Sequence, residues 1–368
     1  MKTTIIVQLL AFMLTLSSGI LPNNTSFFPD QPIPLAGATK LTVYFIDVGQ
    51  ADSALVVCDG ATLLIDGGNV GDSNLLYSFL DKHSISHLDY VVATHAHEDH
   101  VGGLSGALNY ATVGTVYSPV QTYDSRAFSN FVNNVEKQGA SITAPVAGGS
   151  FALGGAKVDI LAPVKTYDEP NNTSIVLKIT HDKVSFLFTG DAEREAEQDI
   201  LAKGYDVSAT VLKVGHHGSE TSSSYPFLRE VMPEYAVISC GTNNSYGHPH
   251  ESILSRLRDA GVKLYRTDMQ GDITFVSNGT TISVATQRNA GVQTNTSDDA
   301  TASGTANDKS EAGTTVPTSL GNYVGNKNSL KFHDPSCRSL PIEKNRVYFD
   351  TRAKALDAGY DPCAICRP

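Results

Sequence analysis

The chain has 368 residues, of which 41% are hydrophobic, so it is long enough for two or three domains with a substantial core. The formal net charge is −11, and the main body carries all of it, whereas residues 321–368 carry eight Lys or Arg against five Asp or Glu. An acidic body does not attract a phosphate-rich polymer, so any affinity for nucleic acid has to come from metal ions or from the basic tail.

The N-terminus has the features of a secretory signal peptide. Met1-Lys2 precedes an apolar stretch from Ile5 to Leu16, and small residues follow it. A single transmembrane anchor is the alternative, but about 12 residues are fewer than the ~20 that a helix needs to cross a bilayer. We therefore expect residues 1–21 to be removed on export, which leaves a secreted protein without stable membrane association.

Between residue 40 and about residue 288, β-branched strands alternate with helical stretches. The Asp59-Gly60 pair predicts a tight turn between two antiparallel strands, and helical spacing predicts a helix that buries Leu75, Leu76, Phe79 and Leu80. The expected strands are Leu41–Val48, Ser53–Asp59, Ala61–Asp66, Leu88–Ala93, Thr115–Tyr117, Lys157–Leu161, Ser174–His181, Val184–Thr189 and Ala236–Ser239, and the last expected helix is Ser252–Asp259. Two successive β-then-α halves predict an α/β (α+β) fold built as an αββα sandwich.

The C-terminal fifth of the chain differs in composition from the main body. Residues 289–320 consist largely of Thr, Ser, Ala, Gly, Asn and Asp, which cannot bury enough surface to offset their ordering entropy. We expect this stretch to be a disordered linker between a folded domain at 40–288 and a small module at 321–368. The module is too short to form a stable hydrophobic core unless a disulfide or a bound metal ion cross-links it.

One cluster places the imidazoles of His95, His97 and His100 and the carboxylate of Asp99 within the six positions 95–100. Alternate residues of a strand share a face, so His95 and His97 can point at one metal ion while Asp99 and His100 fold back toward a second. This spacing is typical of a two-metal hydrolytic centre. The alternative is a solvated histidine-rich loop.

Further candidate ligands follow later strands. Asp191 follows the apolar run 184–189. Two roles stay open for this carboxylate: a ligand that bridges two metal ions, or a helix cap. The adjacent residues His216 and His217 lie between glycines and have little packing value, which favours a site role. His248 precedes the last expected helix and can point back toward the same centre.

These segments together resemble the metallo-β-lactamase fold, and more closely the hydrolase domain of the ComEC competence proteins. The histidine cluster is followed by Gly102-Gly103, and the other matching segments occur in the same order over residues 40–285. Those segments are Phe45–Ser53, Leu64–Gly68, Phe188–Asp191, His216–Ser219 and Tyr246–Pro249.

The resemblance implies two divalent metal ions and a role for each candidate residue. His216 or His217 would contact the scissile phosphate or protonate the leaving oxygen, and Asp66 would orient the ligand histidines from behind. The implied metal ligands are His95 and His97 for the first ion, Asp99 and His100 for the second, Asp191 as the bridge and His248 as the last ligand of the second ion.

One departure concerns the ligand set. Typical members of the fold supply another histidine before the bridging aspartate, but here the only histidine in that interval is His181, in an expected hairpin turn. Asn172 or Ser174 stands in its place as a candidate weak oxygen ligand. A site richer in oxygen favours Mn²⁺ or Mg²⁺ over Zn²⁺, so the metal remains open among the three.

The expected chemistry follows from this ligand set. Two cations about 3.5 to 4 Å apart lower the pKa of a bridging water and clamp the oxygens of the attacked group. Asp99 would orient the resulting hydroxide, and His217 is the expected proton donor to the leaving alkoxide. We expect in-line attack on a phosphodiester.

The tail has the spacing of a structural zinc site. Its ligands would be His333, Cys337, Cys363 and Cys366, whereas Cys58 and Cys240 lie in apolar runs as buried thiols. The segment resembles the zinc module of the Ada DNA-repair protein, which uses four cysteines, so His333 is a departure. The resemblance makes DNA contact plausible for Lys331, Arg338, Arg346 and Arg352; a structural cap without a ligand is the alternative.

The leading hypothesis is a secreted, metal-dependent nuclease that acts on DNA and is held to the polymer by its zinc module. Two other hypotheses stay open. One is a hydrolase of another phosphoester, a lactam or a lactone, because the fold hosts many chemistries. The other is a non-catalytic nucleic-acid-binding protein with a degenerate metal centre. The sequence does not predict an oligomeric state.

Overall fold

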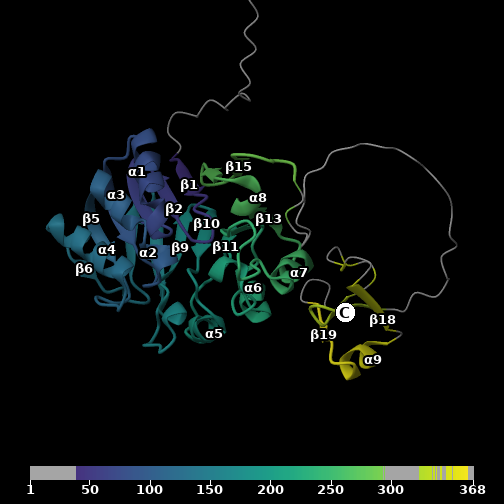
Figure 1. Cartoon of the computed structure of the whole chain (residues 1–368). Helices are drawn as coiled ribbons and strands as arrows, with labels where there is room; N and C mark the ends of the chain where they lie inside the picture. The colour runs from purple at the N-terminus through teal and green to yellow at the C-terminus, as the bar shows by residue number, and fades with distance from the viewer. Residues whose placement is uncertain are drawn as a thin grey trace, which may run out of the picture. The chain divides into compact units, whose positions relative to one another are not determined.

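The computed structural model describes residues 39–292, 294, 323–333, 335, 337, 340–341, 345–349 and 351–363 (Figure 1). The expected signal peptide lies outside these residues, as does all of the expected linker except 289–292 and 294. Among the described residues, none of the helices is long and apolar enough to cross a bilayer.

The first sheet of the hydrolase-like region has eight strands in the order β15-β14-β1-β2-β3-β4-β5-β6. Its strands are β1 (Leu41–Phe45), β2 (Ala54–Cys58), β3 (Ala61–Ile65), β4 (His87–Val92), β5 (Thr112–Tyr117), β6 (Ile142–Thr143), β14 (Ile273–Ser277) and β15 (Ile282–Thr286). The turn between β2 and β3 is at Asp59 and Gly60, whose φ angles of 50° and 88° suit a two-residue hairpin. The predicted turn is confirmed.

The second sheet has seven strands in the order β13-β12-β11-β10-β9-β8-β7. They are β7 (Ser150–Leu153), β8 (Ala156–Ala162), β9 (Val176–His181), β10 (Val184–Phe188), β11 (Val211–Lys213), β12 (Tyr235–Ile238) and β13 (Lys263–Arg266). Strands β9 and β10 form the expected hairpin, and β10 to β13 run parallel.

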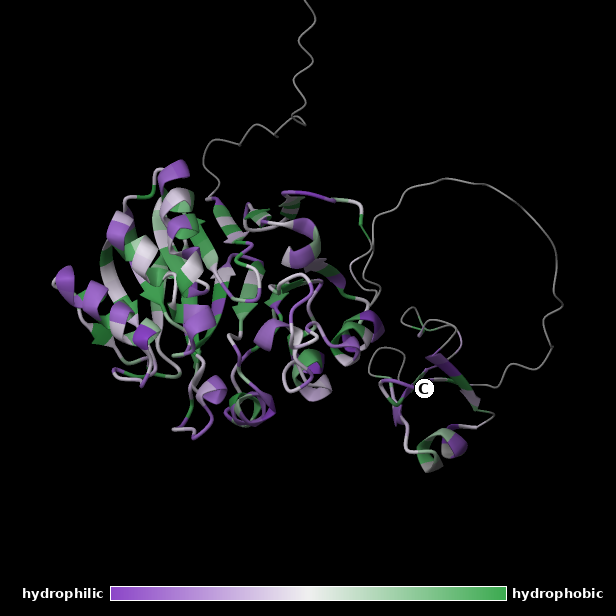
Figure 2. Cartoon of the chain, in the orientation of Figure 1, coloured by the Kyte–Doolittle hydropathy of each residue, from purple (hydrophilic) through white to green (hydrophobic). Residues whose placement is uncertain are grey.

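The two sheets face each other, and helices cover their outer faces. The helices are α1 (Ser73–Lys82), α2 (Glu98–Val101), α3 (Leu104–Tyr110), α4 (Arg126–Lys137), α5 (Arg194–Ala202), α6 (Tyr225–Val231), α7 (Glu251–Asp259) and α8 (Thr267–Gln270). One apolar cluster lies between the sheets, and two more lie between each sheet and its own helices. Figure 2 shows the apolar residues concentrated on the strands and the polar ones on the outer helices. The predicted αββα sandwich is confirmed.

Two local details differ from the expectations. The first strand ends at Phe45 rather than Val48, because the following residues leave the sheet as a loop toward the later strand ends. Leu75 was expected on the buried face of α1 but is 39% exposed, whereas Leu76, Phe79 and Leu80 are buried.

The loops that follow the parallel strands lie at a common edge of the sandwich. Strands β3 and β4 are parallel in the first sheet, and β10, β11 and β12 are parallel in the second. Because the carboxyl ends of parallel strands meet at one edge, polar residues that follow these strands come together. This edge holds the segments that begin at Asp66, Thr94, Gly190, Gly215 and Cys240.

The C-terminal module is a separate small sheet in the order β18-β16-β17-β19. Its elements are β16 (Tyr323–Asn326), β17 (Lys331–His333), β18 (Arg346–Phe349), α9 (Arg352–Asp357) and β19 (Asp361–Pro362). Among the described residues of the module, the buried apolar cluster is formed by Phe332, Ala355 and Tyr360, with Tyr323, Val347 and Phe349 packed against it. So small a core calls for a further cross-link.

Candidate metal centre

Asp66 joins the end of β3 to the histidine cluster after β4. Its carboxylate accepts hydrogen bonds from the backbone N–H and the hydroxyl of Thr94, both at 2.7 Å, and from Nδ1 of His100 at 2.8 Å. Burial raises the pKa of Asp66, against the lowering effect of His100. Because His100 donates through Nδ1, its Nε2 points away from Asp66, toward the edge at which the parallel strands end. This contact is the one that the resemblance implied for Asp66.

Asp99, His100, Asp191 and His217 form the centre of the site. Each offers one ligand atom, and these atoms all lie within 4.8 Å of one another. Nε2 of His100 lies 3.4 Å from Oδ2 of Asp191, and Nε2 of His217 lies 3.2 Å from Oδ2 of Asp99. Burial raises the pKa of Asp191, but His100 and His217 outweigh it and hold that pKa well below its usual range.

His95 and His97 lie beside this centre, as their alternation predicted. Nε2 of His95 is 3.0 Å from Nδ1 of His97, and the His95 ring centroid is 4.1 Å from that of His100. Burial, and after it the charge of His100, lowers the pKa of His95 well below its usual value. The His95 imidazole is therefore kept neutral, the state in which a histidine binds a metal ion.

Two buried atoms at the centre are left without hydrogen bonds. Among the residues that the structure describes, Nε2 of His100 and Oδ1 of Asp191 have no hydrogen-bond partner, although both side chains are almost fully buried. Buried polar atoms without partners are costly, and a cation is the partner that a carboxylate oxygen and an imidazole nitrogen share. The donor set therefore fits the divalent cations that the sequence predicted.

His217 lies in the cluster and His248 lies at its rim. Nδ1 of His217 donates to the carbonyl oxygen of Ser239 at 3.1 Å, while the His248 ring centroid lies 6.4 Å from that of His217. His248 instead accepts a hydrogen bond from the Gln50 amide at 3.3 Å. The structure thus places His217, rather than His248, with Asp99, His100 and Asp191.

His216 and His217 both have left-handed backbone angles, with φ of 51° and 53°. Such angles cost free energy in non-glycine residues and are concentrated at functional sites. The two adjacent rings are inclined at 68° and both approach Asp191: Nε2 of His216 lies 3.7 Å and Nε2 of His217 lies 3.6 Å from Oδ2 of Asp191, while Nδ1 of His216 lies 3.2 Å from Oε1 of Glu193.

Asn172 and Ser174 have roles other than the expected one. The Asn172 side-chain oxygen accepts hydrogen bonds from the backbone N–H groups of Glu193 and Ala196, at 3.0 and 3.4 Å, and so supports the start of α5. The Ser174 hydroxyl accepts from the backbone N–H of Asp191 at 3.0 Å. Neither oxygen belongs to the cluster. Asn172 supports the start of α5 instead of acting as the predicted weak metal ligand. Ser174 positions Asp191.

Asp52 and Lys213 form an ion pair behind the centre that the sequence analysis missed as a site feature. Nζ of Lys213 donates to Oδ2 of Asp52 at 2.7 Å, and the two side chains are only 5% and 6% exposed. Burial raises the pKa of Asp52, but Lys213 outweighs it and the pKa is lowered to about 2. The other carboxylate oxygen lies 3.2 Å from Nδ1 of His217. A lysine inside the apolar strand β11 was the signal for this pair.

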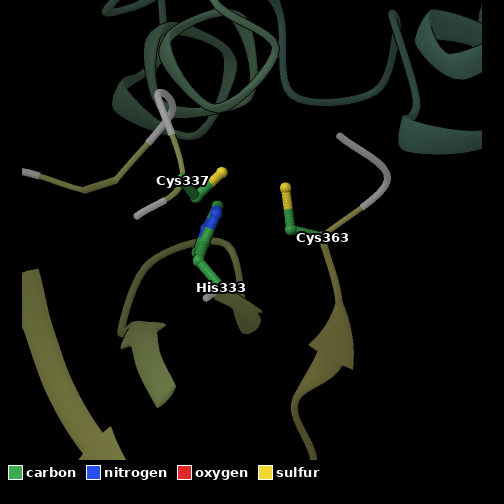
Figure 3. A group of neighbouring side chains, drawn as sticks. All are labelled: His333, Cys337 and Cys363. Atoms are coloured by element: carbon green, nitrogen blue, oxygen red, sulfur yellow. The ribbon is translucent and has the colours of Figure 1, made fainter. Parts of the chain in front are cut away.

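A second candidate metal site lies in the C-terminal module. Ligand atoms of His333, Cys337 and Cys363 lie within 4.8 Å of one another, and Figure 3 shows the three side chains directed at a common point. Both ring nitrogens of the buried His333 lack hydrogen-bond partners among the described residues. One nitrogen and two sulfurs suit zinc, and the fourth expected ligand, Cys366, lies outside the described residues.

The family of the chain follows from comparison with known proteins. Residues 46–242, more than half of the chain, match the metallo-β-lactamase superfamily. The chain belongs to this superfamily. Residues 321–368 match the metal binding domain of Ada. Both resemblances that the sequence predicted are confirmed.

Relatives of this metallo-β-lactamase-fold protein include ComE operon protein 3 of Bacillus subtilis. It is 30% identical over 252 residues, which cover 63% of this chain and 32% of the relative. Competence protein ComA of Neisseria gonorrhoeae is 32% identical over 232 residues, covering 62% of this chain and 31% of the relative. The chain thus spans about a third of the length of these relatives. Among solved structures, YhfI of B. subtilis is 12% identical with a TM-score of 0.42, covering 64% of this chain and all of that one.

The module's metal site leads to a spectroscopic prediction. Loading the full chain with Co²⁺ should give a thiolate-to-cobalt charge-transfer band, because among the candidate metal sites of the described residues this one alone contains cysteine sulfur. Cys363→Ser should remove most of the band and unfold the module, since structural zinc sites supply folding energy. Cys58→Ser, which changes a buried thiol in β2, is the matched control and should keep the band. An unchanged band in Cys363→Ser would contradict the assignment.

Proposed function

We propose that the chain is a metal-dependent nuclease that cleaves DNA phosphodiesters. The observation that carries the proposal is the group Asp99, His100, Asp191 and His217, whose ligand atoms converge while two of them have no hydrogen-bond partner among the described residues. Such a mixed carboxylate and imidazole set suits two-cation hydrolysis of phosphoesters. The hydrolase family of the chain is established, and DNA is the substrate that we propose.

The choice of DNA rests on the relatives and on the charge of the tail. One relative is named Competence protein ComA, and another, at 32% identity, is Recombination protein 2 of Haemophilus influenzae. The body has the wrong charge to attract a polyanion, whereas residues 321–368 have an excess of three positive charges. We propose that the basic zinc module holds the polymer and raises its local concentration at the centre.

The residues of the centre divide the work. His95 and His97 would hold one divalent cation and Asp99 and His100 a second, with Asp191 between them. The cations, when bound, supply Lewis acidity that lowers the pKa of water and neutralises phosphate charge. Comparing the cleavage activity with Zn²⁺, Mn²⁺ and Mg²⁺ will identify which metal ion the centre uses.

His217 has the contacts of a proton donor. Nδ1 donates to the Ser239 carbonyl and Nε2 faces Asp99, so both ring nitrogens carry protons toward acceptors. Burial lowers the pKa of His217, but Asp191 and Asp52 outweigh it and raise the pKa to about 10. In the metal-free protein His217 is therefore held protonated beside Asp99 and Asp191. We propose that it stays outside the ligand sets of the two cations and protonates the leaving oxygen of a cleaved phosphodiester.

The proposal also includes export. Residues 1–21 have the composition of a signal peptide, and removal of this segment would release the enzyme outside the cell, where free DNA is the substrate.

The test is cleavage of plasmid and linear DNA by the purified full chain with Mn²⁺, Mg²⁺ or Zn²⁺. We expect cutting with at least one metal, none in EDTA, and a loss of more than about 100-fold in Asp99→Ala. Asp206→Ala, which changes a carboxylate that is 74% exposed and remote from the centre, is the control and should keep full activity. Cleavage of lactams or simple phosphomonoesters but not of DNA would contradict the proposal.

A chain ending at residue 294 tests the tether separately. It retains both sheets, so we expect it to cut DNA with the same kcat but with a higher KM that rises further with salt. Equal KM values for the two forms would overturn the tether and leave the nuclease intact.

A further inference from the structure

Aromatic rings form a continuous row through the metal centre and end in a tyrosine at each side. In order, the rings are those of Tyr123, His97, His95, His100, His217, His248 and Tyr246, and neighbouring centroids lie 4.1 to 6.4 Å apart. Within residues 39–292, no ring contact joins the Tyr123 end directly to the Tyr246 end. The two tyrosines are therefore the two ends of a row of rings that passes through the metal-binding groups.

Tyr246 is the more exposed end of the row. Its side chain is 67% exposed, and its ring stacks on His248 with centroids 5.6 Å apart and an interplanar angle of 23°. Tyr246 is therefore not held by a hydrophobic core. A single exposed tyrosine is common on protein surfaces, so its position has to carry the argument.

The loop that carries Tyr246 is fixed by its own hydrogen bonds. The Asn244 side chain donates to the carbonyl of Gly241 at 2.9 Å and accepts from the backbone N–H of His248 at 3.0 Å. Nε2 of His250 contacts the Tyr246 carbonyl at 3.2 Å. The exposed ring is thus presented beside the centre without the entropy cost of ordering a loop on binding.

Tyr123 differs from Tyr246 in burial. It is half-buried against Phe128, with centroids 6.2 Å apart, and turns its edge toward His97 at 6.1 Å. Tyr123 therefore contacts His97, an expected ligand of the first cation, whereas Tyr246 contacts His248 at the rim of the centre.

We propose that the substrate is an unpaired stretch of DNA that crosses this row, with the base on one side of the scissile phosphate stacked on Tyr246 and the base on the other side against Tyr123. The inference deepens the proposed function and rests on it. A phosphate bound at the centre has a nucleoside on each side, and in this proposal each end of the row receives one of the two bases. A base offers its face to a side chain only when it is not stacked in a duplex, so single strands are preferred.

The cleavage test uses a single-stranded 12-mer with an abasic position on one or the other side of the cut. With the intact strand, Tyr246→Ala should lower kcat/KM about 5- to 100-fold, because stacking of one base contributes about that factor. Tyr246→Trp should keep the activity. An abasic position on one side should abolish the effect of Tyr246→Ala, and one on the other side should abolish that of Tyr123→Ala.

A binding readout that does not depend on cleavage is available, because the chain contains no tryptophan. In Tyr246→Trp the only indole sits on the proposed platform. Combined with Asp99→Ala to prevent cleavage, this variant should show quenching of its fluorescence when the 12-mer is added in the presence of the divalent ion. A duplex of the same sequence and a fully abasic strand should not quench it. Tyr77→Trp, at a position 45% exposed on α1, is the matched control and should show no quenching by any strand.

The outcomes separate the two proposals. If no DNA is cut with any metal, the nuclease proposal fails, and the indole still reports on the platform. If the single strand is cut but Tyr246→Ala cuts it as fast as the unchanged chain, the stacking proposal is overturned. It is also overturned if the variant's deficit is the same on abasic strands, or if the indole is not quenched by the base-containing strand.

Discussion

Replacing Asp191 with asparagine should lower the hydrolytic kcat/KM by more than about 100-fold and reduce the number of bound divalent ions. Removal of a supporting group near a metal typically costs about 10- to 100-fold, and Asp191 lies in the ligand group itself. Its Oδ2 is 3.4 Å from Nε2 of His100 and 3.6 Å from Nε2 of His217, and Oδ1 has no hydrogen-bond partner among the described residues. Metal content by elemental analysis and kcat/KM on DNA are the measurements.

The same variant should change how the metal-free protein responds to pH. The pKa of His217 is raised to about 10 from 6.5, so this group contributes stability that is present below pH 6.5 and lost as pH rises through about 10. Asp191 is the charge that raises the pKa of His217 most. In Asp191→Asn the free energy of unfolding should therefore fall less between pH 6.5 and about 10 than it does in the unchanged chain. Asp206→Asn, at an exposed carboxylate, should change neither the pH profile nor the metal content. An Asp191→Asn protein that binds two ions would contradict the bridging role.

Much of the centre was predictable because its residues follow strand ends. Once strand and helix alternate, the segments after parallel strands have to meet at one edge, and the ligand types after β4, β10 and β11 then converge. The cluster at His95 to His100 needed no long-range information beyond this. The sandwich was predictable for the same reason, although β14 and β15, which extend the first sheet, follow a chain crossover that short-range patterns do not specify.

The choice between His217 and His248 was not predictable from spacing. It depends on the left-handed backbone at His216 and His217, which brings Nε2 of both rings within 3.7 Å of Oδ2 of Asp191. The role of Asn172 was hidden similarly, since its oxygen supports a helix that starts more than twenty residues later. In both cases the deciding partner comes from another segment of the fold.

The ion pair between Asp52 and Lys213 leads to the second large prediction. Lys213→Met should lower the free energy of unfolding by about 3 kcal/mol, because removing one partner of a buried pair leaves the other charge without compensation. With Lys213 present, the pKa of Asp52 is about 2, below its usual 3.8, so the pair contributes stability above pH 3.8 that is lost as pH falls through about 2. Without Lys213, burial raises the pKa of Asp52 against the lowering effect of His217 and His100, so that pKa should rise and the deficit of the variant should shrink as pH falls. Denaturant unfolding at several pH values measures this.

Lys178→Met is the matched control for this prediction. Lys178 is similarly buried and its Nζ lies the same 2.7 Å from a carboxylate, but its partner, Asp206, is 74% exposed. An exposed carboxylate remains hydrated when its partner is removed, so the control should lose about 1 kcal/mol or less. Adding Asp52→Asn to Lys213→Met should restore much of the stability, since no unpaired charge then remains. It should not restore activity, because Asp52 also faces Nδ1 of His217 at 3.2 Å. Equal losses in the two lysine variants would mean that burial of the carboxylate does not decide the effect.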